Sequence, residues 1–89
     1  MSPRILKEGK FVFWFHSYDV LHENRPSIHV GNGSQNDSGD AKIWLEPKIE
    51  IGRAGRTLNQ TELNQAIKVI AQNLARIMEA WYEHKRKTE

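Results

Sequence analysis

The 89-residue sequence contains no cysteine. Disulfide bonds, thiolate nucleophiles and cysteine-containing zinc sites are therefore excluded. Secreted domains of this size usually carry disulfides, so their absence favours a reducing compartment, and we expect a cytoplasmic protein. The longest apolar run, residues 11–15, is far too short to span a bilayer, and the N-terminus lacks the apolar segment of a signal peptide. No membrane partner is expected.

An excess of charge of one sign is also missing, because 13 lysines and arginines face 11 aspartates and glutamates. The net charge of +2 does not by itself indicate a nucleic-acid-binding protein. The length fits one domain with a single core, residues 1–89. Basic residues do cluster locally, at Arg53 and Arg56 and in the run 84–87. The simplest explanation of that run is that it complements the dipole at the end of a helix.

The last third of the chain predicts an amphipathic helix over roughly residues 59–86. Asn59, followed three residues later by Glu62, has the pattern of a capping box, and Leu58 and Leu63 occupy the hydrophobic-staple positions. The apolar residues that recur every three or four positions are Leu63, Ile67, Ile70, Leu74, Ile77, Met78 and Trp81. One face of this helix is therefore expected to cover the core.

The length of this helix raises a question of its own. A continuous helix would extend about 40 Å at 1.5 Å per residue, longer than any strand in this chain. Either its end overhangs the sheet, or it breaks near Gln72 and Asn73. An overhang bearing Trp81 and Tyr82 would need a partner, so the helix length favours a homodimer.

Short apolar segments before the helix predict strands within residues 4–51. The expected strands are residues 4–6, 11–18, 27–30, 41–45 and 48–51. Two segments are expected to be loops: residues 19–26, and the long stretch 31–40, which contains no apolar residue. The fold class is therefore α+β: a small antiparallel sheet of four to five short strands packed against one long C-terminal helix, continuous or broken into two.

The first long strand is apolar on both faces. Phe11, Phe13 and Phe15 share one face, and Val12 and Trp14 share the other. A helix can cover only one of these faces. The second face is therefore either covered by another part of the chain or used for association.

Histidines are the first candidates for chemistry. His16, His22 and His29 lie close together in the sequence, but their spacing matches no recognised metal signature, so we expect neither a metal site nor a cofactor. His29 points away from the apolar face of its strand and is the candidate catalytic residue, as a general acid or base with Arg25 nearby. A half-buried strand histidine hydrogen-bonded to a neighbouring carbonyl or to solvent is the structural alternative.

Basic and aromatic residues supply the remaining candidates. The candidate nucleic-acid-binding residues are Arg25, Lys42, Arg53 and Arg56, and the candidate partner-binding residues are Trp14, Trp81 and Tyr82. Trp14, Tyr18 and Trp44 could stack bases on a sheet face, although core packing against Trp81 is the simpler explanation. No nucleophile motif and no glycine-rich loop leading into a helix occurs, which argues against an enzyme.

Several segments together resemble a family of small bacterial proteins named domain of unknown function 4160. The segments that match the pattern of that family are Ser2-Pro3-Arg4-Ile5, Phe13-Trp14-Phe15-His16-Ser17, Pro26-Ser27-Ile28-His29-Val30, Ala41-Lys42-Ile43-Trp44-Leu45, Asn73 and Trp81. Ser27 stands where the family usually has the first histidine of a His-x-His pair, and the loop 31–40 is longer than usual. The resemblance implies a protein often encoded beside another small protein in toxin–antitoxin-like gene pairs.

The leading functional hypothesis is therefore a small bacterial protein that acts mainly by binding a cognate protein from a neighbouring gene, within a toxin–antitoxin-like or mobile-element module. The first alternative is a metal-independent ribonuclease or RNA-binding toxin that uses His29. The second alternative is a phage-type inhibitor of a host protein.

Overall fold

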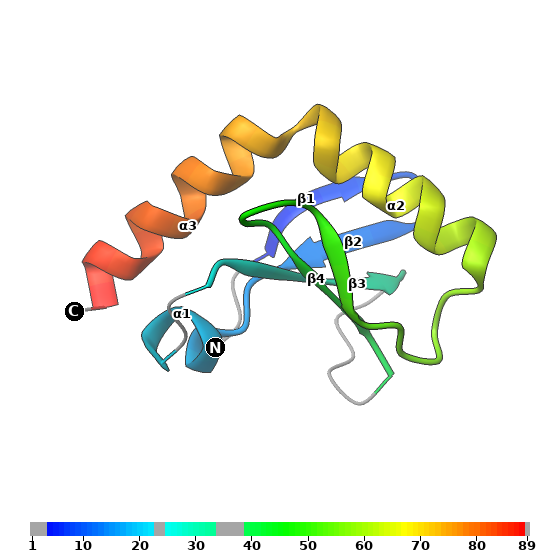
Figure 1. Ribbon diagram of the computed structural model, residues 1–89, viewed down its shortest axis with the longest axis horizontal. Helices are drawn as coiled ribbons and strands as arrows, with labels where there is room; N and C mark the ends of the chain where they lie inside the picture. The colour runs from blue at the N-terminus through cyan, green and yellow to red at the C-terminus, as the bar shows by residue number, and fades with distance from the viewer. Residues whose placement is uncertain (1–3, 23–24, 34–38, 89) are drawn as a thin grey trace.

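The computed structural model describes residues 4–22, 25–33 and 39–88 (Figure 1). Its elements are β1 (Arg4–Glu8), β2 (Phe11–Trp14), α1 (Ser17–His22), β3 (Ser27–Asn32), β4 (Ala41–Trp44), β5 (Glu50–Arg53), α2 (Gln60–Gln72) and α3 (Leu74–Thr88). The five strands form one antiparallel sheet in chain order. The predicted α+β class is confirmed. None of the described helices is long and apolar enough to cross a membrane.

The boundaries of several elements differ from the prediction. The strand expected over 11–18 ends at Trp14, and the helix α1 takes up the end of that expected strand and the first half of the expected loop 19–26. This helix forms because Val20 is apolar and packs in the core, while its N–H donates to the carbonyl of His16 at 3.2 Å. The last strand lies at Glu50–Arg53 rather than 48–51, and β3 continues into the expected loop as far as Asn32. Residues 34–38 of that loop lie outside the described residues.

The long C-terminal helix breaks at Asn73, between α2 and α3. Of the two predicted alternatives, the break near Gln72 and Asn73 is therefore the correct one. The side-chain amide of Asn73 donates to the carbonyl of Val69 at 2.8 Å, and its backbone N–H is shared between the carbonyls of Val69 and Ile70. α2 and α3 then form an arch over one face of the sheet (Figure 1). Because the helix bends, Trp81 returns to the core and is only 1% exposed.

The core lies between this arch and the facing side of the sheet. Phe13 and Phe15 point toward the helices, and the ring of Phe15 meets the ring of Trp81 edge-on, with centroids 5.3 Å apart. Burying each large apolar side chain of this kind contributes roughly 1.5–3 kcal/mol. Trp14 is also buried but stands on the opposite side of the sheet from this cluster, so the expected packing of Trp14 against Trp81 is wrong.

The predicted capping box is present at the start of α2. Glu62 N–H donates to Asn59 Oδ1 at 2.8 Å, and Asn59 N–H donates to Glu62 Oε1 at 2.9 Å. Leu58 and Leu63 are both buried, as the hydrophobic staple requires. Glu62 also pairs with Lys10, in the turn between β1 and β2. The start of the helix is therefore tied both to its own backbone and to the sheet.

Replacing the cap should destabilise the whole domain. Asn59→Ala leaves the first N–H groups of α2 without a side-chain acceptor, so the free energy of unfolding should fall by about 1 kcal/mol. For a domain of this size the melting temperature should fall by roughly 4–8 °C. Urea and thermal unfolding measure both quantities. The control is Gln65→Ala, an exposed position inside α2. If both variants unfold alike, the cap does not hold the helix start.

Candidate functional site

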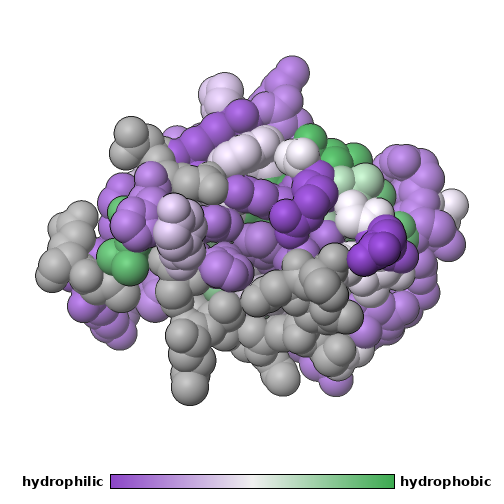
Figure 2. Space-filling model, turned by 90° about the horizontal axis from the view of Figure 1, so that it is seen from below, coloured by the Kyte–Doolittle hydropathy of each residue, from purple (hydrophilic) through white to green (hydrophobic). Residues whose placement is uncertain are grey.

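The sheet face opposite α2 and α3 carries a row of side chains that crosses four strands. Trp14 of β2 pairs with His29 of β3, His29 pairs with Lys42 of β4, and Lys42 pairs with Arg53 of β5. Directly opposed residues in an antiparallel sheet have Cβ atoms about 4.5–5.5 Å apart. The row therefore brings an aromatic ring, a histidine and two cations together. Figure 2, which views this side of the molecule, shows hydrophilic residues at its centre.

A β-bulge completes this row. The register of β4 against β5 shifts between Lys42 and Ile43, so that Ile43 faces Ile51 while Lys42 faces Arg53. The extra residue is Gly52, and a Cβ at that position would lie only 2.7 Å from Nε1 of Trp44. Bulges re-aim the side chains that follow them. Here the bulge turns Arg53 onto the polar face.

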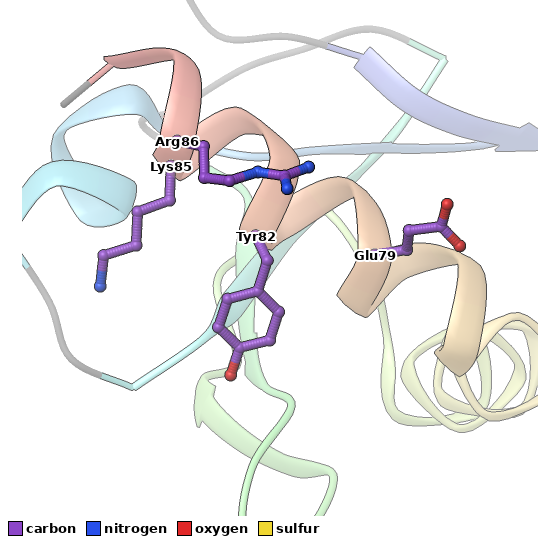
Figure 3. A pocket seen from close by; sticks show the side chains of 4 residues that line it. All are labelled: Glu79, Tyr82, Lys85 and Arg86. Carbon is purple, nitrogen blue, oxygen red and sulfur yellow. The ribbon is translucent and has the colours of Figure 1, made fainter.

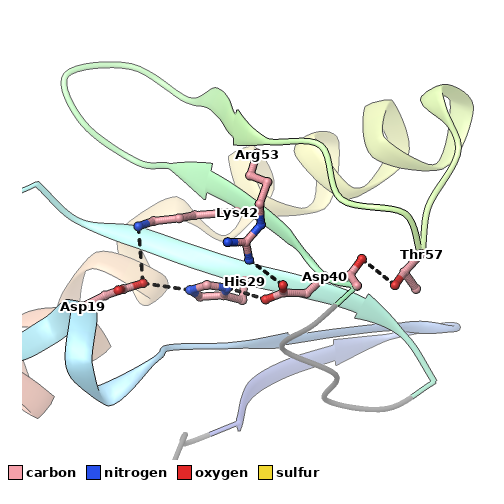
Figure 4. Close-up of polar contacts among 7 residues, drawn as sticks. Asp19, His29, Asp40, Lys42, Arg53 and Thr57 are labelled. Carbon is pink, nitrogen blue, oxygen red and sulfur yellow. Dashed lines mark hydrogen bonds and ion pairs between the residues drawn. The ribbon is translucent and has the colours of Figure 1, made fainter.

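His29 lies between two carboxylates at the centre of the row. Its Nε2 lies 2.8 Å from Oδ2 of Asp19, and its Nδ1 bonds Oδ2 of Asp40 (Figure 4). Arg53 donates to the other oxygen of Asp40 at 2.6 Å, and Nζ of Lys42 lies 3.6 Å from Asp19. His29 is 4% exposed and Asp40 is 1% exposed. The result is a chain of alternating basic and acidic side chains whose centre, formed by Asp19, His29 and Asp40, is buried.

The two carboxylates determine the protonation of the ring. An ionised carboxylate only accepts hydrogen bonds, so a ring nitrogen that faces one must donate. Both nitrogens of His29 face carboxylates, and the arrangement therefore fits an imidazolium that donates twice. Burial raises the pKa of Asp19, but the hydrogen bond from His29 and the charges of Lys42, His29 and His16 outweigh burial and lower it below its usual value.

Two segments outside the sheet hold the carboxylates in place. Asp19 comes from α1, whose Val20 is anchored in the core. Asp40 comes from the turn before β4, where the carbonyl of Gly39 accepts the N–H groups of Arg56 and Thr57 at 3.0 Å and the hydroxyl of Thr57 at 2.6 Å. Gly55 has a φ of 71°, and a Cβ there would lie 2.2 Å from the carbonyl oxygen of Asp40. Only glycine allows this close approach.

The network borders a pocket of about 220 Å³. The pocket is lined by His16, Asp19, His29, Lys42 and Arg53. The ring of His16 lies 5.6 Å from that of His29, and the ring of Trp14 stacks on His29 at 6.0 Å with planes 20° apart. A water molecule occupies about 30 Å³ of liquid, so the pocket has room for a small polar group such as a phosphate.

The candidates from the sequence are distributed unevenly around this pocket. His29, Lys42 and Arg53 line it together. Arg25 does not line it, and its guanidinium lies 4.5 Å from the ring of Trp44. Arg56 is exposed and does not line the pocket.

Of the candidate partner-binding residues, only Tyr82 is exposed at the surface, at 49%. Trp14 and Trp81 are buried on opposite sides of the sheet. Tyr82 is therefore the one of these three candidates that a partner could contact directly.

Sequence reasoning missed the two carboxylates and the role of His16 in the pocket. Asp19 was expected in a loop, and Asp40 at the end of a long loop, where acidic residues are common and carry no signal. The one available signal was that Asp40 immediately precedes a strand.

Ser27, which stands where a histidine is usual in the resembling family, does not join the network. It is buried opposite Trp44, and its hydroxyl has no hydrogen-bond partner within residues 4–22, 25–33 and 39–88. Polar groups of this kind ordinarily find a partner when they are buried. The network at the pocket is therefore built around His29 and does not require a histidine at position 27.

The histidines do not gather into one cluster. His22 packs against the ring of Tyr18 at 4.3 Å and does not line the pocket. In the part of the chain that the structure describes, no group of three or more histidines, aspartates or glutamates is arranged to hold a metal ion.

These features define a small α+β protein with a helix-covered core on one face of its sheet and a charged pocket on the other. The chain belongs to the family described as Domain of unknown function (DUF4160), whose family model matches residues 11–82. The match contains every residue of the pocket and also Tyr82, and it confirms the resemblance noted in the sequence. No curated protein and no solved structure matches the chain.

The lowered pKa of Asp19 predicts a pH-dependent contribution to stability. The unfolded chain binds a proton at this carboxyl near pH 3.9, whereas the folded protein keeps it ionised to lower pH. The stabilisation is therefore complete well above about pH 4 and is lost as the pH falls through the folded-state pKa. The difference in free energy of unfolding between wild type and Asp19→Asn should be largest near neutral pH and shrink in acid.

Urea unfolding between about pH 2.5 and 7 measures this difference. Glu83→Gln is the control, because Glu83 is half exposed and pairs with Lys87 one turn later in α3. A difference between wild type and Asp19→Asn that stays constant with pH would show that Asp19 is not stabilised as an anion.

Proposed function

We propose that this protein binds single-stranded RNA on the polar face of its sheet and holds a backbone phosphate in the pocket beside His29. The observation that supports this most directly is the register of β3, β4 and β5, in which His29, Lys42 and Arg53 oppose one another at one pocket. Lysine and arginine bind phosphate by charge and by hydrogen bonds. Three of the five catalytic and nucleic-acid-binding candidates from the sequence therefore lie at one pocket and can bind one ligand.

The charge balance of the pocket supports an anion. Three basic side chains, His29, Lys42 and Arg53, face the two carboxylates Asp19 and Asp40. The side chain of Arg53 is 52% exposed, so only one edge of its guanidinium is used by Asp40. Arginine has five N–H donors in a planar fork. The outer donors of Arg53 can therefore bind a phosphate without releasing Asp40.

Binding rather than cleavage is the activity that the geometry favours. A general acid or base must present an atom to the substrate within hydrogen-bond distance. Both ring nitrogens of His29 are bonded to carboxylates, and its ring is almost completely buried. Catalysis by His29 requires Asp19 to leave Nε2 first. We therefore assign His29 a positioning role in RNA binding, and its catalytic role stays a prediction.

Salt dependence tests whether Lys42 contacts phosphate. Each phosphate contact on a single strand contributes about −0.7 to the slope of log affinity against log salt. Lys42→Ala should therefore weaken binding of a fluorescein-labelled oligouridine and of other RNA sequences equally. It should also reduce the magnitude of the slope of log affinity against log salt by about 0.7. Fluorescence anisotropy at several salt concentrations measures both. The control is Lys68→Ala, an exposed lysine on α2. An unchanged slope in Lys42→Ala would show that Lys42 does not contact a phosphate in this pocket.

A second candidate function is binding of a cognate small protein, as in a toxin–antitoxin-like module. The observation that favours it is a group of exposed large apolar side chains on α1 and α3, two helices that contact each other: Tyr18, Leu21 and Tyr82. Beside Tyr82, residues Glu79, Lys85 and Arg86 complete a pocket of about 450 Å³ (Figure 3). Exposed tyrosines flanked by charged residues are common at protein interfaces.

Co-expression with the neighbouring gene product tests this second function. The two proteins should elute together at micromolar concentration, and Tyr82→Ala should weaken the complex at least fivefold, because an interface tyrosine commonly contributes more than 1 kcal/mol. Gln65→Ala, on the other helix, should leave the complex intact. Light scattering on the chain alone reports whether the same surface forms a homodimer instead. Separate elution of the two wild-type proteins would contradict partner binding.

A further inference from the structure

A second cavity, with a lining different from that of the pocket beside His29 (the phosphate pocket), lies beyond the end of β4. Its volume is about 310 Å³, and it is lined by Arg25, Pro26, Glu46 and Pro47. None of these residues belongs to the network around His29. We propose that this cavity is a nucleobase subsite selective for guanine, an inference that rests on RNA binding at the neighbouring pocket.

Arg25 supplies a fixed flat surface for a base. Its Nε donates to the carbonyl of Glu46 at 2.6 Å, its guanidinium pairs with the carboxylate of Glu50, and its Cζ lies 4.5 Å from the centre of the Trp44 ring. The guanidinium is thus held at its edges by two groups and supported on one side by an aromatic ring. The side chain is 36% exposed. Unpaired RNA bases stack on such guanidinium planes and aromatic rings.

Trp44 itself is held where this stack requires it. Its indole rests against Gly52, the bulged residue of β5, where any side chain would collide with Nε1. Lys42 also lies over the Trp44 ring, at 4.6 Å. Trp44 therefore connects the lysine that lines the phosphate pocket to the arginine that lines the base cavity.

The spacing of the two cavities fits one short oligonucleotide. Lys42 and Glu46 are four residues apart, about 13 Å in an extended backbone. Pro26 and Pro47 add apolar rings to the cavity wall, and the backbone holds the two sides together because Leu45 N–H donates to the carbonyl of Pro26 at 3.0 Å. A phosphate in the first pocket and a base from an adjoining nucleotide in the second can be bound at once.

The carboxylate of Glu46 decides which base fits. A carboxylate accepts two parallel hydrogen bonds and donates none. The pairing edge of guanine presents two adjacent donors, N1–H and the 2-amino group. Adenine, cytosine and uracil each place an acceptor beside their donor, and a carboxylate repels that acceptor. Glu46 is exposed, and within the described residues its carboxylate accepts one weak hydrogen bond, from the hydroxyl of Tyr82 at 3.4 Å, so its oxygens are available to a ligand.

The same carboxylate argues against an acidic peptide as the occupant. Arg25 could attract a peptide carboxylate, but its charge is already matched by Glu50, and Glu46 adds a further negative charge to the cavity. A ligand that donates hydrogen bonds to Glu46 and stacks on Arg25 satisfies both groups.

The test compares three fluorescein-labelled RNA octamers by anisotropy: all uridine, uridine with one central guanosine, and uridine with one central inosine. Inosine lacks only the 2-amino group. Wild type should bind the guanosine octamer about tenfold more tightly than the inosine octamer, because a hydrogen bond to a charged group is lost. Glu46→Gln should reduce this ratio to less than about twofold.

The matched control is Glu83→Gln, which makes the same change of charge on α3 and should keep the tenfold ratio. Circular dichroism checks that each variant is folded. Equal wild-type binding of the guanosine and inosine octamers, still weakened by Lys42→Ala, would overturn the guanine subsite and leave the phosphate pocket standing. A full preference for guanosine in Glu46→Gln would also overturn the subsite. Absence of wild-type binding to all three octamers would overturn the subsite and the proposed RNA binding together.

Discussion

The buried contact of His29 with two aspartates is the constraint on which the polar half of the molecule depends. Charged groups inside a protein are costly unless each has a partner, and removing one partner leaves the others uncompensated. Asp19 ties His29 to α1, and Asp40 ties it to the turn before β4 and to Arg53 of β5. One side chain therefore links a short helix, a turn and an edge strand. The pocket is the space that these elements leave between them.

The sheet divides two kinds of stabilisation between its faces. Side chains alternate along each strand, so Ile28 and Val30 enter the apolar core while His29, between them, faces the charged pocket. The core stabilises by area removed from water and tolerates repacking, whereas the network depends on hydrogen-bond geometry. Changes to the two faces should thus have different consequences: core changes alter mainly stability, whereas network changes alter stability together with the shape and charge of the pocket.

Much of the fold could be predicted because its signals are local. Alternation along the strands gave the two faces, and the Asn59 and Glu62 pair gave the start of α2. The site was harder to predict because its contacts join residues that are distant in the chain. Nothing in the local sequence says that Asp19 and Asp40 face His29, since this depends on a six-residue helix and on the turn held by Thr57. The bulge at Gly52 likewise decides the direction of Arg53, and strand periodicity alone does not reveal it.

The three tryptophans occupy three distinct environments. Trp81 meets Phe15 in the apolar core, Trp14 stacks on the ring of His29, and Trp44 lies beneath the side chains of Arg25 and Lys42. Trp14 and Trp81 are almost completely buried, so Trp44 is the indole that a quencher in solution reaches most readily. The emission of the native chain therefore combines separate optical reporters on the core, the charged network and the surface between the two cavities, without any added label.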